Sequence, residues 1–102
     1  MELDQTTPSK GRILECVAKE YGLTADTIRN GKCRNKTFAE ARQVYCFLCY
    51  KHTSFTFLEI GAYINRTHPT VSYSVDKMAF LYDHDKAFAT RIDKLTDLLE
   101  NE

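Results

Sequence analysis

Apolar residues recur three and four positions apart along most of the chain, which is the spacing of a helix with one face on a core. The first such segment begins after Pro8, where Ser9 is a candidate N-cap, and stops at Gly22, a residue suited to a left-handed C-cap. The pattern predicts a helix over residues 9–21 whose inner face carries Ile13, Leu14, Val17, Ala18 and Tyr21.

The next segments predict two more helices with a loop between them. Thr24 is placed to cap a short helix that reaches about residue 29 and buries Ile28. Residues 30–36 (N-G-K-C-R-N-K) show no periodicity and indicate an exposed basic loop. Thr37 and Glu40 form a T-x-x-E capping box, which predicts a third helix to about residue 51. Its buried stripe is expected to hold Phe38, Ala41, Val44, Tyr45, Leu48 and Cys49.

A second capping box, Thr56 with Glu59, predicts a fourth helix over about 57–64. Phe57, Ile60 and Ile64 should face inward, and Gly61 should allow close helix contact. After a short turn at 65–67, Pro69 suits the first position of a fifth helix. Its core side is expected to carry Val71, Val75, Met78 and Leu81.

Residues 82–85 break this pattern, and a sixth helix then carries Phe88, Ile92, Leu95 and Leu99. No segment alternates like a strand, so the sequence predicts an all-α fold of about six helices. The fourth and fifth helices are amphipathic and joined by a tight turn, which is the layout of a helix-turn-helix.

The chain has 102 residues, of which 43% are hydrophobic, and this is typical of one domain with one modest core. Residues 1–8 are polar and are expected to form a disordered lead, followed by a single domain over 9–102. No apolar run reaches the roughly 18–20 residues that a membrane span needs. Glu2 and Asp4 stand where a signal peptide would carry positive charge, so a cytoplasmic location is expected.

Four cysteines raise a question of metal binding. Cys46 and Cys49 form a C-x-x-C, and His52 follows three residues later, so zinc or redox chemistry is one interpretation. A structural zinc site needs four closely placed ligands, however. The same spacing also suits small apolar filler on a continuous helix, and this interpretation is favoured. No cofactor or metal is therefore expected.

The formal net charge is zero, but the charges are unevenly distributed. Residues 29–77 hold eight basic and three acidic side chains, whereas both flanking segments are net acidic. A basic centre can attract phosphate locally. A merely solvated face explains the charges equally well, so charge alone does not decide between the two.

The second helix of a helix-turn-helix enters the major groove, and its first residues meet base edges. Here that position holds the polar set Arg66, Thr67, His68, Pro69, Thr70 and Tyr73, with Lys77 one turn further on. Arginine can bond guanine with two hydrogen bonds, threonine and histidine can donate or accept, and methyl groups can touch thymine. Backbone N–H groups at the start of the fourth helix, Thr56 to Leu58, could hold a phosphate. The basic loop offers Lys32, Arg34 and Lys36 to a neighbouring phosphate or minor groove.

Each of these residues also has a purely structural interpretation. Thr67 or His68 could serve only as a helix cap, and Tyr73 could half-bury against the third helix. Taken together, at the groove-facing end and beside a basic loop, they favour binding of double-stranded DNA.

At these residues the sequence resembles the C-terminal DNA-binding domain (domain IV) of the bacterial replication initiator DnaA family. The resemblance covers about residues 11–82. It rests on I-L-E-C-V-A-K-E-Y-G-L-T in the first helix, the basic loop, A-R-Q at 41–43, L-E-I-G at 58–61, and R-T-H-P-T-V-S-Y-S-V at 66–75. The last segment is similar to the family signature, which is close to R-D-H-T-T-V-x-H-A.

The resemblance implies an all-α domain with a helix-turn-helix of the Trp-repressor type that binds a short asymmetric duplex site at replication origins. Arg66, His68 and Thr70 would contact DNA from the recognition helix. Arg42 and Gln43 would support backbone contact, and Arg34 and Lys36 would act from the basic loop. Leu58 stands where the family commonly has a proline near a phosphate.

Four positions depart from the family pattern. Thr67 replaces an aspartate, Pro69 a base-contacting threonine and Tyr73 a histidine, while Glu40 precedes A-R-Q where some members use arginine. The turn between the two motif helices also looks one residue short. A lost base contact costs roughly 1–3 kcal/mol of discrimination. These changes argue against recognition of the family's standard box, but not against duplex binding.

Three functions are weighed on this basis. The leading hypothesis is sequence-selective binding of duplex DNA by a nucleoid-associated protein. The sequence has no G-x-x-x-x-G-K-[ST] phosphate loop and no Ser-His-Asp set, so no enzymatic activity is expected. A monomer is the favoured oligomeric state. The sequence does not distinguish a role in replication from one in transcription or in a mobile element. The alternative is a protein-interaction module on the same fold, motivated by Glu40, the neutral net charge and the acidic last helix. A zinc or redox protein is the third.

Overall fold

The computed structural model describes residues 8–31 and 35–100, so nearly all of the predicted lead at 1–8 lies outside the described residues. Six helices follow one another: α1 (Lys10–Tyr21), α2 (Ala25–Asn30), α3 (Lys36–His52), α4 (Phe57–Tyr63), α5 (His68–His84) and α6 (Lys86–Glu100). Within the described part there is no strand, and no helix is long and apolar enough to cross a membrane. The all-α prediction with six helices is confirmed.

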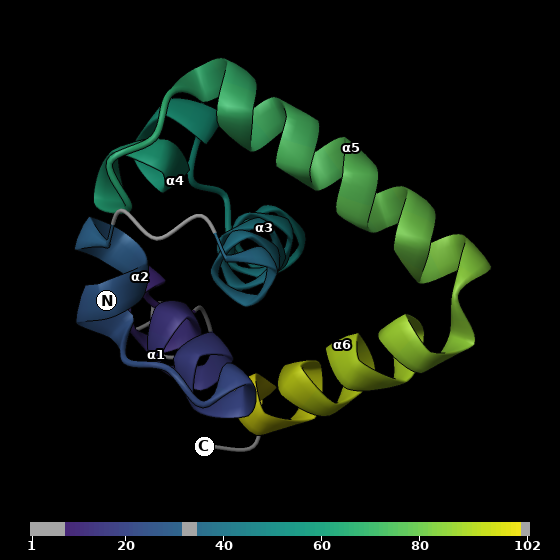
Figure 1. The fold of residues 1–102 in the computed structure, drawn as a ribbon. Coiled ribbons are helices and arrows are strands. Elements are labelled where there is room, and N and C mark those ends of the chain that lie inside the picture. Colours follow the sequence, from purple (N-terminus) through teal and green to yellow (C-terminus); the bar gives the residue numbers. More distant parts are fainter. Residues whose placement is uncertain (1–7, 32–34, 101–102) are drawn as a thin grey trace.

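Helix α3 runs through the middle of the molecule, and the other helices surround it (Figure 1). Its middle is buried on every side, because six consecutive residues from Val44 to Cys49 are all buried, whereas Tyr50 one residue later is exposed. The predicted stripe of one helical face is therefore too narrow, since Cys46 and Phe47 are buried as well. Phe38, predicted as buried, is only half-buried, because it lies near the exposed start of the helix.

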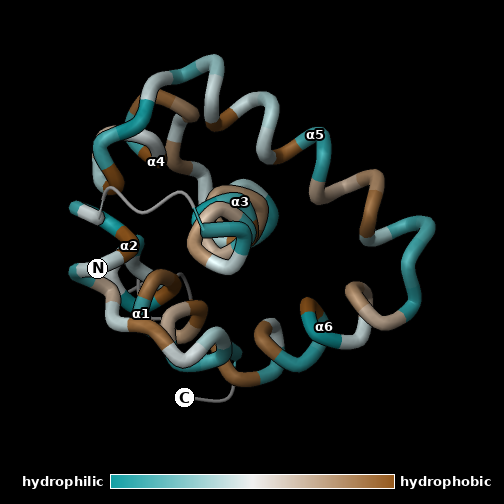
Figure 2. The backbone as a smooth tube through the Cα atoms, in the orientation of Figure 1, coloured by the Kyte–Doolittle hydropathy of each residue, from teal (hydrophilic) through white to brown (hydrophobic). Residues whose placement is uncertain are grey.

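The surrounding helices each turn one apolar side towards α3. Figure 2 shows this for α5, whose hydrophobic turns lie along the edge that faces α3. All four apolar residues predicted for α6 are buried, as are Ile13, Leu14, Val17 and Ala18 of α1. Three further predicted core positions, Tyr21, Phe57 and Leu81, are only half-buried and pack against the edge of the core.

Most predicted helix starts are confirmed by their hydrogen bonds. Ser9 and Thr24 accept the backbone N–H three residues later, and Gly22 ends α1 at φ 70°. The capping box of α4 is complete, with Thr56 and Glu59 bonded to each other's backbone.

The predicted start of α3 is wrong by two residues. Asn35 is the N-cap and accepts from the Thr37 N–H at 2.6 Å, so Lys36 is the first helical residue and not part of a loop. Glu40 forms no capping box. Its carboxylate instead accepts a hydrogen bond from the Tyr21 hydroxyl at 2.6 Å, because α1 lies close enough to compete for it.

The end of α5 also differs from the prediction. The helix continues through residues 82–84 and stops only at Asp85. The polar residues that break the apolar pattern face outward there, with His84 stacked on Phe80 one turn earlier (ring centroids 4.1 Å apart). At the other end the helix starts at His68, so Pro69 is its second residue and not its first.

A Schellman motif closes the turn between α4 and α5. The Arg66 N–H donates to the Gly61 carbonyl at 2.9 Å, and the Asn65 N–H donates to the Ala62 carbonyl at 3.2 Å. The predicted close approach at Gly61 is confirmed, because a Cβ there would lie 2.6 Å from the Arg66 oxygen and 2.9 Å from Val71 Cγ2. Glycine is thus required for the short turn to close against α5.

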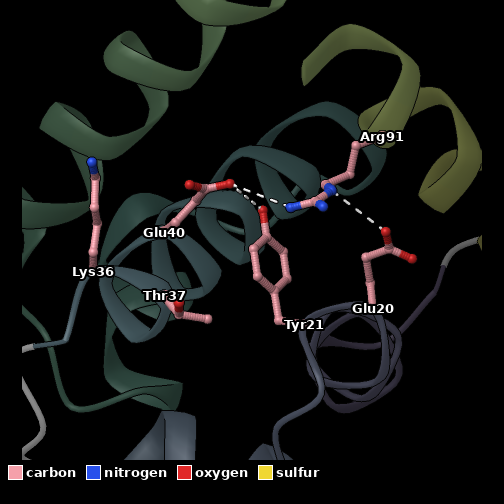
Figure 3. A pocket seen from close by; sticks show the side chains of 6 residues that line it. All are labelled: Glu20, Tyr21, Lys36, Thr37, Glu40 and Arg91. Atoms are coloured by element: carbon pink, nitrogen blue, oxygen red, sulfur yellow. Dashed lines mark hydrogen bonds and ion pairs between the residues drawn. The ribbon is translucent and has the colours of Figure 1, made fainter. Parts of the chain in front are cut away.

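Helix α6 is fastened by polar contacts as well as by its apolar face. Arg91 bridges Glu20 of α1 and Glu40 of α3, with nitrogen–oxygen distances of 3.4 and 3.6 Å (Figure 3). Its guanidinium carbon also lies 4.8 Å above the Tyr21 ring. Burial and the bond to Glu40 raise the pKa of Tyr21, so this hydroxyl stays a donor.

Gly61→Ala is expected to destabilise the protein by about 1–3 kcal/mol, because the added methyl group must displace backbone. Thermal unfolding followed by circular dichroism measures this as a lowered midpoint. The matched control is Gly11→Ala, whose Cβ would meet side chains and no backbone, the nearest atom being the Tyr63 hydroxyl at 3.1 Å. A midpoint for Gly61→Ala equal to that of the control would contradict the packing argument.

Candidate nucleic-acid interface

The first turn of α5 presents four consecutive exposed residues, from Thr67 to Thr70. Thr67 is the N-cap by position, but its side chain makes no capping bond, and its hydroxyl lies 3.3 Å from that of Thr70. The N–H groups of a first turn have no partner inside the helix, and the helix dipole makes this end positive. The start of α5 therefore offers both a favourable field and exposed hydroxyls to an anionic or hydrogen-bonding partner.

A row of aromatic rings holds His68 in place at this end. The His68 ring lies 5.4 Å from that of Phe57, which in turn lies 5.9 Å from that of Tyr50. These three rings come from α5, α4 and α3. The alternative in which His68 only caps the helix is wrong, because Thr67 is the N-cap by position and His68 is an exposed first helical residue whose ring packs on Phe57.

Arg66 lies differently from its neighbours. It is half-buried, and its Nη1 donates to the carbonyls of Ile64 and Asn65 at 3.3 and 3.1 Å. The guanidinium thus folds back on the end of α4, whose last carbonyls lack partners within the helix. Arg66, His68 and Thr70 are the three residues predicted to contact DNA from this helix. His68 and Thr70 are exposed, whereas Arg66 would have to give up its two hydrogen bonds to Ile64 and Asn65 to reach a base.

Tyr73 and Lys77 continue the surface along α5. Tyr73 is 61% exposed, so the alternative in which it half-buries against α3 is wrong. The Lys77 ammonium lies 6.0 Å from the Tyr73 ring, on the same side of the helix. Both residues are placed to contact a surface that the first turn of α5 touches.

The start of α4 offers less than predicted. The capping box occupies the Thr56 hydroxyl, and the Glu59 carboxylate accepts the Thr56 N–H at 2.8 Å, which lowers the pKa of Glu59. Only the next N–H groups, at Phe57 and Leu58, have no partner inside the helix. Leu58 is 66% exposed, so this end presents an apolar side chain beside a carboxylate.

The other predicted residues lie on or near α3. Arg42 and Gln43 are half-buried, and both Arg42 and Arg66 lie close enough to Cys46 to act on its thiol electrostatically. Lys36 is exposed at the rim of a cavity of about 340 Å³ that Glu20, Tyr21, Glu40 and Arg91 also line (Figure 3). Lys32 and Arg34 lie outside the described residues.

The cysteine motif is part of the core. Cys46 and Cys49 are buried, and burial raises the pKa of each thiol to about 12. His52 instead pairs with Thr96 of α6 at 3.2 Å. Among the described residues no group of three or more histidine, cysteine or acidic side chains is arranged to hold a metal ion.

The sequence-based prediction missed Tyr50 and Phe57 as neighbours of the site. Phe57 was expected to face the core, and Tyr50 lies outside the predicted stripe of α3. An aromatic residue that directly follows a capping threonine is near the helix start, where the chain is still partly exposed, and this was the available signal.

Comparison with known proteins identifies similar sequences. Residues 11–78 match the family described as bacterial DnaA protein helix-turn-helix. The chain is similar to the chromosomal replication initiator protein DnaA of Nostoc punctiforme, with 30% identity over 95 residues, which is 92% of this chain and 20% of that protein. The DnaA of Pelobacter propionicus is 32% identical over 88 residues, 85% of this chain and 19% of that protein. This chain therefore spans about a fifth of the length of the curated relatives it matches.

Cys46 and Cys49 are expected to resist alkylation by iodoacetamide at neutral pH, because a thiol with a pKa near 12 is almost entirely protonated and the thiolate is the nucleophile. Half-buried Cys16 should react faster, and all thiols should react in denaturant. Peptide mass spectrometry measures the extent at each position. Rapid labelling of Cys46 in the folded protein would contradict its burial and reopen the redox interpretation.

Proposed function

The chain belongs to the family of the bacterial DnaA helix-turn-helix, and on that premise we propose that it binds double-stranded DNA sequence-selectively through the first turn of α5. The observation that carries the proposal is the exposure of Thr67, His68, Pro69 and Thr70 at the uncapped, positive end of a helix held by a tight turn. Residues at this end of the second motif helix are the ones that meet base edges in the major groove.

The chemistry of these side chains suits base reading. The exposed edge of His68 can donate or accept a hydrogen bond, and the Thr70 hydroxyl can do both. Pro69 and the Thr70 methyl group supply apolar contacts of the kind that thymine methyls make. Arg66 can bond guanine with two hydrogen bonds once it leaves the carbonyls of Ile64 and Asn65.

Phosphate contacts would come from both sides of this turn. Lys77 and Tyr73 lie further along α5, and Lys36 and Arg42 belong to α3. Lys32 and Arg34 are proposed for the same role from the segment before α3, as are Gln43 and the N–H groups of Phe57 and Leu58, whereas the Thr56 N–H is taken by Glu59. Glu59 opposes these contacts at α4, so electrostatic attraction is expected to be moderate.

The proposal also covers catalysis, oligomeric state, cellular location and biological process. The protein acts as a binding module without catalysis, as a monomer, in the cytoplasm and on the nucleoid. Because Thr67, Pro69 and Tyr73 differ from the resembled family signature, its preferred site differs from that family's standard box. Replication is the process that the relatives' names support.

One observation favours a protein partner as a second candidate. Phe80 is 60% exposed on the same helix, beyond the proposed DNA contacts, and Leu58 is 66% exposed at the start of α4. Large exposed apolar side chains can mark contact sites for proteins. Absence of duplex binding at moderate salt, with capture of a defined protein partner, would favour this candidate.

His68→Ala and Arg66→Ala are each expected to weaken binding to the preferred duplex by roughly 5- to 150-fold, the range of a lost base contact. The duplex is first obtained by selection from random DNA, and affinities are then measured by titration at one salt concentration. The matched control is His84→Ala, since His84 is an exposed histidine at the opposite end of α5. If both variants bind as tightly as the parent, the assignment of α5 as the reading helix is wrong.

Lys77→Ala is expected to weaken binding similarly on all duplexes and to lower the slope of log affinity against log salt by about one, as for one lost phosphate contact. Titrations at several salt concentrations, on the preferred and on a scrambled duplex, measure both effects. Lys94→Ala is the control, because Lys94 pairs with Glu20 away from α5. A loss confined to the preferred duplex would show that Lys77 reads bases instead.

A further inference from the structure

Asn65 has an unusual backbone conformation. Its φ is 60°, and no other non-glycine residue of the described segments has a positive φ. It occupies the position after the C-cap of α4, where left-handed geometry closes the Schellman motif. Glycine would serve that geometry with the least strain. Asparagine also tolerates this geometry, and unlike glycine it brings a side chain that can form hydrogen bonds.

That side chain reaches a distant part of the chain. Its Nδ2 donates to the Arg29 carbonyl at 3.1 Å and to Asn30 Oδ1 at 3.0 Å, both at the end of α2. An amide nitrogen carries two hydrogens, so both are used. Asn30 is itself oriented, because its Nδ2 donates to Asp26 Oδ1 at 3.0 Å.

Arg29 makes a second connection between the same two segments. Its Nε donates to the Tyr63 carbonyl at 2.7 Å, and its guanidinium carbon lies 4.3 Å above the Tyr63 ring. The Tyr63 ring also lies 6.2 Å from that of Tyr45 in the core. The last residue of α4 and the turn after it are thus held from outside the helix-turn-helix, by α2 and α3.

We propose that Asn65 is a positioning residue for DNA recognition, which ties the turn before α5 to the end of α2 and so fixes the direction in which the first turn of α5 points. This inference rests on the proposed DNA binding. The next two residues, Arg66 and Thr67, carry the chain from Asn65 directly into α5. A turn free to rock would have to be ordered on binding, at an entropic cost that a held turn avoids.

Asn65 should therefore matter more for affinity to the preferred duplex than for affinity to a scrambled duplex. Base contacts need the first turn of α5 at the right angle, whereas phosphate attraction tolerates small displacements. Loss of the Asn65 side chain should therefore weaken binding to the preferred duplex and leave binding to a scrambled duplex nearly unchanged. If Asn65 only stabilised the fold, its loss would reduce the folded fraction and lower the apparent affinities for both duplexes by the same factor.

Asn65→Gly tests this, because glycine adopts the positive φ readily while the substitution removes the whole side chain and with it both hydrogen bonds to α2. The ratio of affinities for the preferred and scrambled duplexes is expected to fall about tenfold, within the range of one weakened base contact. Equal loss on both duplexes would overturn the proposal in favour of a role in folding alone. An unchanged ratio would overturn it outright.

A second pair of variants changes the α2 side of the contact between Asn65 and α2. Asn30→Ala removes one of the two acceptors of Asn65 and keeps the other, the Arg29 carbonyl, so it should lower the ratio in the same direction and by a smaller factor. Asp26→Ala is the comparison variant, because it removes the bond that orients Asn30 and leaves the Asn30 acceptor in place, so a smaller effect than that of Asn30→Ala is expected. An equal effect of both would show that α2 stability, not the contact, matters. If the parent protein prefers no duplex at all, the proposed function fails instead, and the two failures are distinguishable.

Discussion

Burial of α3 is the constraint on which the rest of the molecule depends. Six consecutive residues of this helix, Val44 to Cys49, are inaccessible, so the other helices must cover it from all sides. In a chain of this size, one helix buried on every side organises a single core that all the other helices can share. This arrangement explains why an apparent metal motif, Cys46 and Cys49, is packing material here, since both thiols lie within that core.

The covering helices α4 and α5 can approach each other closely only because residue 61 has no side chain. Once the turn is closed at Gly61, the chain enters α5 with four exposed residues, Thr67 to Thr70. The turn is also tied to α2, because the Asn65 side chain donates to the Arg29 carbonyl and Arg29 Nε donates to the Tyr63 carbonyl. The proposed reading surface is therefore held by contacts that lie outside it.

Local signals in the sequence predicted the elements well where the deciding interaction is local. Ser9, Gly22 and the Thr56–Glu59 box each act within one helical turn, and each is confirmed. The Thr37–Glu40 box failed although it has the same pattern. Its glutamate is taken by Tyr21, and no rule confined to neighbouring residues could show that α1 would lie within reach.

Local signals were enough to predict six helices, most of their apolar positions, and the polar set from Arg66 to Thr70 at the start of the second motif helix. Periodicity and capping settle these points, because they depend on residues within one or two turns of each other. Packing around α3 was needed to show that Arg66 folds back on the end of α4, that Phe57 and Tyr50 hold His68, and that Asn65 reaches α2. The His68 and Asn65 contacts join different helices, so their geometry exists only in the packed fold. The Arg66 bonds are local, but they form at a turn that closes only when α4 packs against α5.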